Sequence, residues 1–323
     1  MIIYIKLLID LVKSLIIKIV PEIILGEIMS VIPNQKDKKF TKFYKTKKLF
    51  KNASAKPVWL GWRELASLHK IYPLHNSYSY DPKSLDDRGK DRTELILSLV
   101  PKELEKINNI LELGCYDGMV SCNLQRRGKI TTAIDNRIDG IDNRAIDEGV
   151  KFLQMDAENL EFENEMFDMV FSFDAFEHFN KPDMVLQEAI RVVKPGGFIY
   201  LQFGPLFFAP MGLHIYNIIG VPYCQFLFSK ELLKEYFNTK GSNPFTFEND
   251  QIVSDTQLNG WSLEEYRNLW KNNSHVLRKI KYNESKDLSQ FDIIRKYPSC
   301  FKSKVNHFES LTISFIEVLF RKK

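Results

Sequence analysis

The stretch NNILELGCYDGMVSCNL, residues 108–124, contains the pattern that decides the fold. An apolar run at 110–113, interrupted by Glu112, leads into two glycines four positions apart, Gly114 and Gly118. A segment that looks helical follows. A strand that ends at glycine and continues into a helix usually holds a ligand at the turn. The stretch therefore predicts a strand, a ligand-binding turn and a helix.

The residues on both sides of this turn alternate between strand and helix patterns. A helix broken at Pro101 precedes it, and a later helix begins at Pro182 and ends at Pro195-Gly196-Gly197. Strands that alternate with helices form parallel sheets with right-handed crossovers. Strands are predicted at 110–113, 129–135, 151–156, 167–173, 198–203 and 310–322, and helices at 91–99, 117–127, 139–149 and 182–194.

The composition is that of a globular protein with a core of its own. The chain has 323 residues, of which 44% are apolar and 27% charged, enough for one large domain or two small ones. The four cysteines show no spacing typical of a metal site, and we expect no metal and four reduced thiols. No signal-peptide cleavage pattern follows the apolar N-terminus.

The N-terminal residues differ in charge from the rest of the chain. Residues 1–51 carry 11 lysines, no arginine and four acids, whereas the remainder carries 34 basic and 37 acidic residues. Residues 1–20 predict a helix with a broad apolar face, but its four charges argue against a membrane span. A helix that lies in the headgroup region fits this pattern. A helix docked on the protein's own core or on a second subunit is the alternative.

A lysine-rich segment follows at residues 36–51, with eight lysines and four aromatic residues. It is either a solvated linker or a patch for an anionic membrane surface, where each lysine is worth roughly 1 kcal/mol. An apolar helix beside a polybasic segment is the pair of signals that peripheral anchoring needs. Nucleic acid is the weaker option, because nothing in the segment would read bases. We therefore expect a cytoplasmic protein that is peripheral on the inner face of the membrane.

The acids near the predicted turn indicate which ligand it holds. A dinucleotide fingerprint needs three glycines, and Glu112 would oppose a pyrophosphate but suit a cation. Asp135 ends the second strand, where a carboxylate accepts ribose hydroxyls. Asp156 ends the third strand, where it can meet an adenine amine. The pattern predicts a site for a cationic nucleoside without phosphates.

These features resemble the class I S-adenosylmethionine-dependent methyltransferases, in the type 11 small-molecule branch. The resemblance covers roughly residues 90–240, and its landmarks are ILELGCYDG, AID, MDAENL, FDMVFSFDAFEHF and VVKPGGFIYL. It implies an α/β Rossmann-like sheet of seven strands, the last of them antiparallel, with helices on both faces. We expect an N-terminal extension at 1–55 and a methyltransferase domain at 56–323, with a cofactor core at 90–240, a substrate and lid insertion at 205–305 and the last strand at 310–322.

The resemblance also implies roles for residues at the ends of four strands. Glu112 and Gly114 would border the methionine and ribose part of S-adenosylmethionine, Asp135 would hold the ribose diol, and Asp156 with Ala157 would face the adenine. The segment from Phe173 to His178 would form the floor of the methionine end. The cofactor-binding residues expected are Glu112, Gly114, Tyr116, Gly118, Asp135, Asn136, Asp156, Ala157 and Phe173.

Tyr116 departs from the family pattern, which usually has glycine there. Glycine at such a turn gives close backbone approach to the ligand, so a tyrosine weakens the expectation of binding. The alternative is a protein that binds S-adenosylmethionine, or interacts with a partner, without catalysis.

Two histidines are candidates for a general base, His178 and His214. Either imidazole could accept a proton from an acceptor hydroxyl; His178 could instead orient the loop after the fourth strand. The sequence FDAF follows that strand in place of the motif used for amine methylation of bases, and no cysteine lies nearby for attack on cytosine. We therefore predict O-methylation of a small-molecule, glycan or lipid-linked acceptor, with a pocket shaped by residues 205–305.

Overall fold

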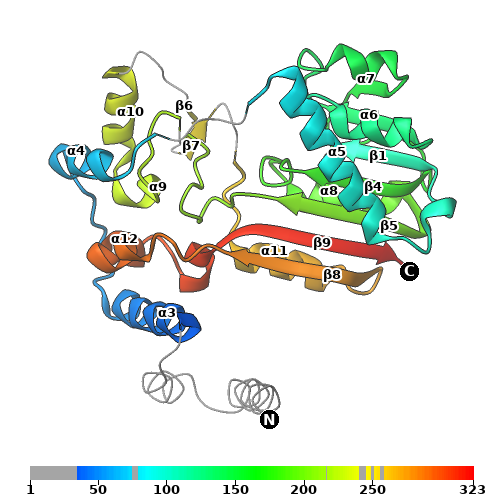
Figure 1. Cartoon of the computed structure of the whole chain (residues 1–323). Helices are drawn as coiled ribbons and strands as arrows, with labels where there is room; N and C mark the ends of the chain where they lie inside the picture. Colours follow the sequence, from blue (N-terminus) through cyan, green and yellow to red (C-terminus); the bar gives the residue numbers. More distant parts are fainter. Residues whose placement is uncertain (1–34, 75–78, 216, 240–244, 249–250, 255–257) are drawn as a thin grey trace, which may run out of the picture. The chain divides into compact units, whose positions relative to one another are not determined.

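The computed structural model describes residues 35–74, 79–215, 217–239, 245–248, 251–254 and 258–323 (Figure 1). The helix predicted at residues 1–20 lies outside these residues. The chain forms two compact units: one joins the residues up to Val58 with Leu288–Phe308, and the other contains Trp59–Asp287 and Glu309–Lys323. In the described ranges, no helix is long and apolar enough to cross a membrane.

The larger unit is built on a seven-stranded sheet with the order β3-β2-β1-β4-β5-β9-β8. The strands β1 to β5 are parallel, whereas β9 is antiparallel to both β5 and β8. The predicted sheet, with an antiparallel last strand, is confirmed. The strands are β1 Asn109–Leu113, β2 Ile130–Asp135, β3 Lys151–Gln154, β4 Phe167–Phe173, β5 Val193–Phe203, β8 Leu277–Lys286 and β9 Ile313–Lys322.

Helices cover both faces of this sheet because side chains alternate along each strand. In β1, Ile110 packs in a core with α5 and α6, whereas Leu111 and Leu113 pack in a separate core with α8 and α11. Glu112 shares the face of Ile110, which places a carboxyl group beneath α6. The helices are α5 Pro82–Leu99, α6 Met119–Arg126, α7 Asn143–Asp147, α8 Pro182–Val192 and α11 Leu263–Asn272.

Helix α5 begins nine residues before the predicted start at Asp91. The side chain of Asp81 caps it by accepting hydrogen bonds from the amides of Lys83 and Ser84 at 3.0 and 3.1 Å, and Pro82 occupies the first turn. Gly89 then allows close packing on α6, since a Cβ there would lie 2.6 Å from the carbonyl oxygen of Met119. The earlier start brings the middle of α5 to the loop after β1.

Helix α8 ends at Val192, so the prediction that it ends at Pro195-Gly196-Gly197 is wrong. Val193 already pairs with Phe167 and begins β5, which carries those three residues through a shift in register opposite β4. A buried β-branched residue favours the strand. Of the other predicted elements, β4 has the predicted bounds, β1 and β5 begin earlier, and α6, α7, β2 and β3 are shorter. β9 starts at Ile313 because a 3-10 turn, η3 Phe308–Thr312, precedes it.

The segment from 205 to 305 contains several short elements and one strand of the main sheet, β8. Its middle contains α11, which begins after Ser262, a residue whose side chain accepts a hydrogen bond from the amide of Glu265. Also in the larger unit are α4 Trp62–Ile71, η2 Leu104–Lys106, α9 Cys224–Leu227, α10 Lys230–Thr239, β6 Phe245–Glu248 and β7 Gln251–Ser254.

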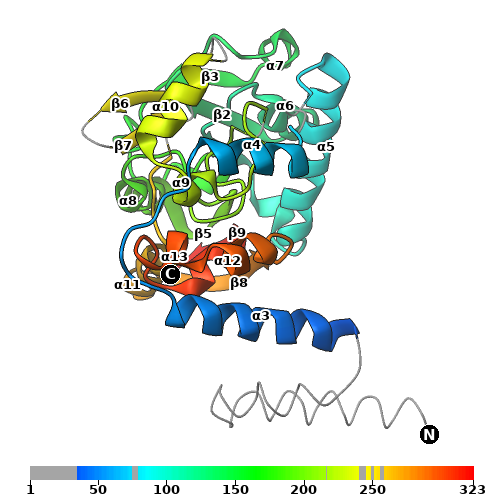
Figure 2. The ribbon, with the colours of Figure 1, turned by 90° about the vertical axis from the view of Figure 1, so that its left-hand side faces the viewer.

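The smaller unit places the lysine-rich segment on a helix, α3 Gln35–Asn52, beside α12 Phe291–Lys296 and α13 Pro298–Lys302 (Figure 2). Phe43 and Phe50 both contact the ring of Phe308, with centroids 5.4 and 5.5 Å apart. Lys42 pairs with Asp292 at 2.9 Å. The helix therefore holds its aromatic face against its neighbours, and Lys45, Lys48 and Lys51 are exposed.

Candidate functional site

A cavity of about 590 Å³ opens at the carboxyl ends of β1, β2 and β4, with α5 as one wall. Open α/β sheets bind ligands at this edge. The structure brings together at the cavity most of the residues expected from the sequence: Glu112, Gly114, Tyr116, Asp135, Asn136, Ala157, Phe173 and His178. Three expected residues, Gly118, Asp156 and His214, do not line it.

The two glycines of the turn serve different purposes. Gly114 has a φ of +72°, and a Cβ there would lie 2.5 Å from that of Ala175, across the cavity edge. Gly118, with a φ of +73°, precedes α6, and its missing side chain leaves room for the ring of Phe152. Gly114 therefore allows close approach at the cavity, whereas Gly118 allows helix packing behind it.

Tyr116 contributes its backbone rather than its side chain to the turn. The residue has a φ of +46°, and its amide donates a hydrogen bond to Oδ2 of Asp135 at 2.9 Å. Oδ1 of Asp135 accepts from the amide of Arg137 at 3.1 Å. The tyrosine ring is 49% exposed and lies 5.7 Å from the ring of Tyr80. The side chain thus turns outward, and the two amides orient the carboxylate that the sequence assigns to a ribose.

Glu112 is a buried carboxyl group at the floor of the cavity. Its Oε2 accepts hydrogen bonds from the hydroxyl and amide of Ser121, at 2.6 and 3.2 Å. Burial nevertheless raises the pKa of Glu112 from 4.5 to about 8, and the bonds from Ser121 oppose this shift only in part. A cation that enters the cavity would favour the ionised form, so Glu112 suits a positively charged ligand.

The adenine end differs from the expectation in one residue. Ala157 lines the cavity together with Met155, but Oδ1 of Asp156 accepts a hydrogen bond from the amide of Glu158 at 2.9 Å. The carboxylate of Asp156 therefore caps its own turn. Gln154 supports the opposite loop, since its amide nitrogen donates to the carbonyl of Asn136 at 2.9 Å. The contact of Asp156 with an adenine stays a prediction.

Two arginines of α5 reach the cavity and were missed by the sequence analysis. Arg88 and Arg92 lie one turn apart and both line the wall. Arg92 pairs with Asp174 and lies over the ring of Phe173, 4.9 Å from its centroid. Arg88 lies 3.7 Å from a carboxylate oxygen of Asp117. The signal was the i, i+4 spacing, lost because the helix was predicted to begin after Arg88. Such guanidinium groups can bind a carboxylate.

The loop after β4 brings buried titratable groups to the other side of the cavity. Oε1 of Glu177 accepts a hydrogen bond from the amide of Gly204 at 3.0 Å, while Oε2 is buried without a hydrogen-bond partner. Burial raises the pKa of Glu177 to about 7. It also raises the pKa of Asp174, and Arg92 opposes that shift. His178 lines the cavity, with its Nε2 3.8 Å from Oε1 of Glu177.

His214 lies behind His178 rather than in the cavity. The two rings are 5.0 Å apart, edge to face, and Nε2 of His214 is 2.6 Å from the carbonyl oxygen of Pro205. Burial lowers the pKa of His214 to about 4, which keeps its imidazole neutral. These two rings and Glu177 lie close enough to share a cation. However, His214 and Glu177 already bond to backbone groups. Of the two histidines, His178 is the one placed to meet a ligand.

Comparison with known proteins indicates a methyltransferase. Residues 111–201 match a family model described as a methyltransferase domain. The ubiquinone biosynthesis O-methyltransferase of Colwellia psychrerythraea is 25% identical over 225 residues, which cover 65% of this chain and 85% of that protein. The fatty-acid O-methyltransferase of Mycolicibacterium smegmatis is 34% identical over 149 residues, 42% of this chain and 54% of that protein.

Other relatives are also covered only in part. The chain spans 51% or 58% of the length of further ubiquinone biosynthesis O-methyltransferases. Among solved structures, the PH0226 protein from Pyrococcus horikoshii OT3 is 18% identical, with a TM-score of 0.47, over 80% of this chain and 99% of that chain. The family match, the sheet order and the cavity together identify the domain. The chain carries a class I S-adenosylmethionine-dependent methyltransferase domain of the type 11 branch.

Proposed function

We propose that this protein transfers the methyl group of S-adenosylmethionine to an oxygen atom of a small-molecule acceptor. The observation that carries the proposal is one cavity that holds a buried Glu112, a backbone-oriented Asp135 and, from the loop after β4, His178. The relatives support oxygen as the acceptor atom, because their names include ubiquinone and fatty-acid O-methyltransferases. More specifically, we propose that the acceptor is a lipid-linked molecule or a glycan.

The residues present fit the methyl donor. Gly114 lets the turn at the cavity edge pack against the methyl group of Ala175, where any side chain would collide, and the carboxyl groups suit a cationic nucleoside. When bound, the donor supplies a methyl group on a sulfonium, which is a good leaving group. Asp135 would accept hydrogen bonds from the ribose hydroxyls, and Glu112 would face the positive charge of the methionine part. Arg88 and Arg92 could hold its carboxylate.

Besides binding the donor, the protein must align the methyl group with the acceptor oxygen and, for some acceptors, remove a proton. Alignment of the reacting atoms in a closed cavity can contribute ~7–11 kcal/mol. A hydroxyl acceptor must also lose a proton, and His178 is placed to accept it; a base of this kind contributes ~10²–10⁴-fold. A carboxylate acceptor is already ionised and needs no base. Dependence of the rate on His178 therefore distinguishes the two acceptor classes.

The test uses the full-length protein with methyl-labelled donor and a cell extract separated into lipid, small-molecule, glycan, protein and RNA fractions. We expect label in the lipid or small-molecule fraction, in an alkali-resistant ether for a hydroxyl acceptor or an alkali-labile ester for a carboxylate. Label only in protein or RNA would refute the proposal. Donor binding by calorimetry without label in any fraction would favour the alternative, a non-catalytic S-adenosylmethionine-binding protein.

We further propose that the exposed lysines of α3 bind an anionic membrane surface. Support comes from the aromatic face of α3, which packs within the smaller unit and leaves Lys45 and Lys48 exposed. Reversal of both charges to glutamate should reduce sedimentation with phosphatidylglycerol vesicles, most strongly at low salt. The matched control reverses Lys102 and Lys151, two exposed lysines of the larger unit. Equal losses in both variants would contradict a specific role of α3.

A further inference from the structure

Exposed apolar side chains are concentrated in residues 59–74 of the larger unit. Trp59, Trp62, Ile71 and Leu74 are between 41% and 60% exposed, all within sixteen residues. Single exposed apolar residues are ordinary, but a concentration of large ones, with two tryptophans, marks an interaction surface. We call residues 59–74 the α4 platform, because α4 forms most of it.

The rest of the unit holds the α4 platform firmly. At its start, the amide of Leu60 donates a hydrogen bond to the carbonyl of Leu227 at 2.7 Å. At its end, Gly220 fits so closely that a Cβ there would lie 2.1 Å from the carbonyl oxygen of Pro73. Between these points, Leu65 and Leu68 bury the inner side of α4. The exposed side chains therefore belong to a fixed element whose inner face is already packed.

Trp62 is held at the surface by one polar and one aromatic contact. The indole nitrogen of Trp62 donates to a carboxylate oxygen of Glu235 at 3.3 Å, and its ring lies 6.2 Å from that of Tyr236. A tryptophan with one edge in a polar contact and the remainder exposed is the arrangement favoured at a membrane interface. Fixed rings also lose little conformational entropy when they insert.

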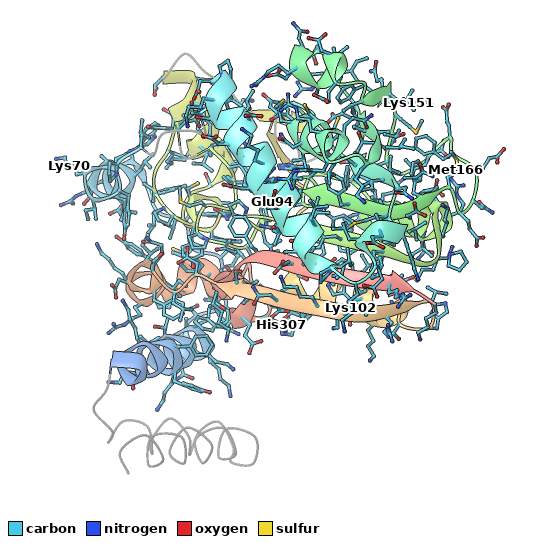
Figure 3. All side chains as sticks on the ribbon, turned by 45° about the vertical axis from the view of Figure 1, so that its right-hand side comes forward. Lys70, Glu94, Lys102, Lys151, Met166 and His307 are labelled. Carbon is cyan, nitrogen blue, oxygen red and sulfur yellow. The ribbon has the colours of Figure 1, made fainter. Side chains whose placement is uncertain are left out.

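The α4 platform carries two exposed basic side chains, Arg63 and Lys70, and one acid, Glu64, whose carboxylate accepts a hydrogen bond from the amide of Gly61 at 3.3 Å. Arg63 and Lys70 are exposed on the same helix as Trp62 and Ile71, and Figure 3 shows Lys70 extending from the outer edge of the unit. Basic side chains among tryptophan and aliphatic residues are typical of helices that lie in the headgroup region of anionic bilayers.

We propose that the α4 platform docks the methyltransferase unit on the headgroup interface of an anionic lipid bilayer. This surface is separate from the lysines of α3, and it lies on the unit that contains the cavity. The benefit of docking rests on the proposed function, because a docked enzyme would encounter an acceptor that is dissolved in the bilayer. The docking itself requires no methyl transfer and can be tested without it.

Tryptophan fluorescence of the full-length protein provides the test. The chain has four tryptophans, of which Trp270 is buried and Trp261 only partly exposed. Vesicles of phosphatidylglycerol and brominated phosphatidylcholine should shift the emission to the blue and quench it, because bromine quenches at close range. The W59F/W62F variant should still sediment with the vesicles but lose this quenching. Bound wild-type protein without quenching would overturn the proposal.

A second measurement keeps the inference independent of fluorescence. W59A/W62A should lower the partition coefficient between water and vesicles roughly tenfold or more. The variant lacks both indole rings, so the free energy gained by burying them in the bilayer interface is lost. The matched control, I130A/M166A, removes two apolar side chains that are 62% and 42% exposed elsewhere on the unit, and should leave partition unchanged. Equal losses in both variants, or concentration-dependent dimers that bury Trp59 and Trp62, would overturn docking on lipid.

Donor affinity, measured by calorimetry, separates the two proposals. W59A/W62A should bind the donor as the wild type does, which also shows that the variant is folded. Loss of docking with intact donor binding is the expected result. A wild type that binds vesicles through Trp59 and Trp62 but neither binds donor nor transfers methyl would refute the proposed function alone.

Discussion

The two walls of the cavity are built in different ways. On the wall formed by β1 and β2, Glu112 receives its hydrogen bonds from Ser121, nine residues away, and Asp135 receives one from Tyr116, nineteen residues away. On the wall after β4, Asp174 pairs with Arg92 across 82 residues, and Glu177 bonds to Gly204 across 27. The wall with Glu112 and Asp135, the proposed donor side, is therefore set by local sequence. The wall with Asp174 and Glu177, the proposed acceptor side, is set by long-range packing that includes Arg92, a residue that the proposed function also assigns to the donor. Substitutions on each wall should separate binding from turnover.

The largest effect is expected on the acceptor side. With a hydroxyl acceptor, His178→Ala should reduce turnover by ~10²–10⁴-fold, the contribution of a positioned base. Donor affinity, measured by calorimetry, should change far less, because the proposed contacts to the ribose and the sulfonium come from Asp135 and Glu112 on the opposite wall. His275→Ala removes an exposed histidine and serves as the control. A His178 variant that keeps most of its rate on a hydroxyl acceptor would show that alignment alone drives the reaction.

On the donor side, the buried carboxyl group of Glu112 should lower the free energy of unfolding near neutral pH. Its pKa is raised from 4.5 to about 8 in the folded state, so the folded protein retains a proton that the unfolded chain releases. The contribution of Glu112 to stability is therefore most favourable below pH 4.5, falls as the pH rises towards 8 and is constant above that. Glu112→Gln removes the ionisable group, and at pH 7 it should raise the free energy of unfolding by up to ~3 kcal/mol, since one pKa unit is ~1.4 kcal/mol.

Urea unfolding of both proteins from pH 5 to pH 9 measures this difference. The free energy of unfolding of Glu112→Gln, relative to the wild type, should increase between pH 5 and pH 8 and then level off. The variant should bind the donor more weakly than the wild type. A constant difference across the range would mean that Glu112 is ionised in the folded protein and that its pKa is not raised.

The ribose carboxylate should have a smaller effect, confined to binding. Asp135→Ala should weaken donor binding by ~1.5–3 kcal/mol, the range for hydrogen bonds to a charged group. Turnover at saturating donor should change less than the dissociation constant. Asp139→Ala, an exposed acid of the same loop, is the matched control. If Asp135→Ala leaves the dissociation constant unchanged, another residue holds the ribose.

The contrast between the walls also explains what the sequence could predict. The parallel sheet and the positions of Glu112, Gly114 and Asp135 follow from the alternation of strand and helix patterns and from residues at strand ends, which are local features. The seven strands and the antiparallel last strand were implied by the family resemblance. Arg88 and Arg92 were missed because their role depends on where α5 begins and on how closely Gly89 lets it approach α6. These are tertiary properties that no short pattern contains.

The roles of the two histidines and the exposure of the tryptophans also could not be predicted from local sequence. His178 and His214 were both candidates in the sequence, and only the fold separates a residue in the cavity from one that bonds to Pro205. Asp156 was expected to end its strand, but β3 ends at Gln154 and the carboxylate of Asp156 caps the following turn. The exposure of Trp59 and Trp62 likewise depends on the packing of Leu65 and Leu68 beneath them, and an amphipathic pattern of ten residues does not show which apolar side chains stay outside.

The smallest effect is expected for Tyr116, the residue that departs from the family pattern. Its φ of +46° costs a side-chain-bearing residue ~1–2 kcal/mol, and glycine would remove that strain. Glycine also adds ~0.4–1 kcal/mol of unfolded-state entropy, so Tyr116→Gly should change the free energy of unfolding by less than about 1 kcal/mol. The bond to Asp135 comes from the backbone amide and survives the change. Donor affinity, measured by calorimetry, should therefore stay within about threefold of the wild type, which is less than ~1 kcal/mol. Gly114→Ala in the same turn should abolish most binding, because its Cβ would collide with Ala175. A tenfold loss in Tyr116→Gly would instead show that the exposed ring contacts the bound donor, and the donor wall would then extend to Tyr80.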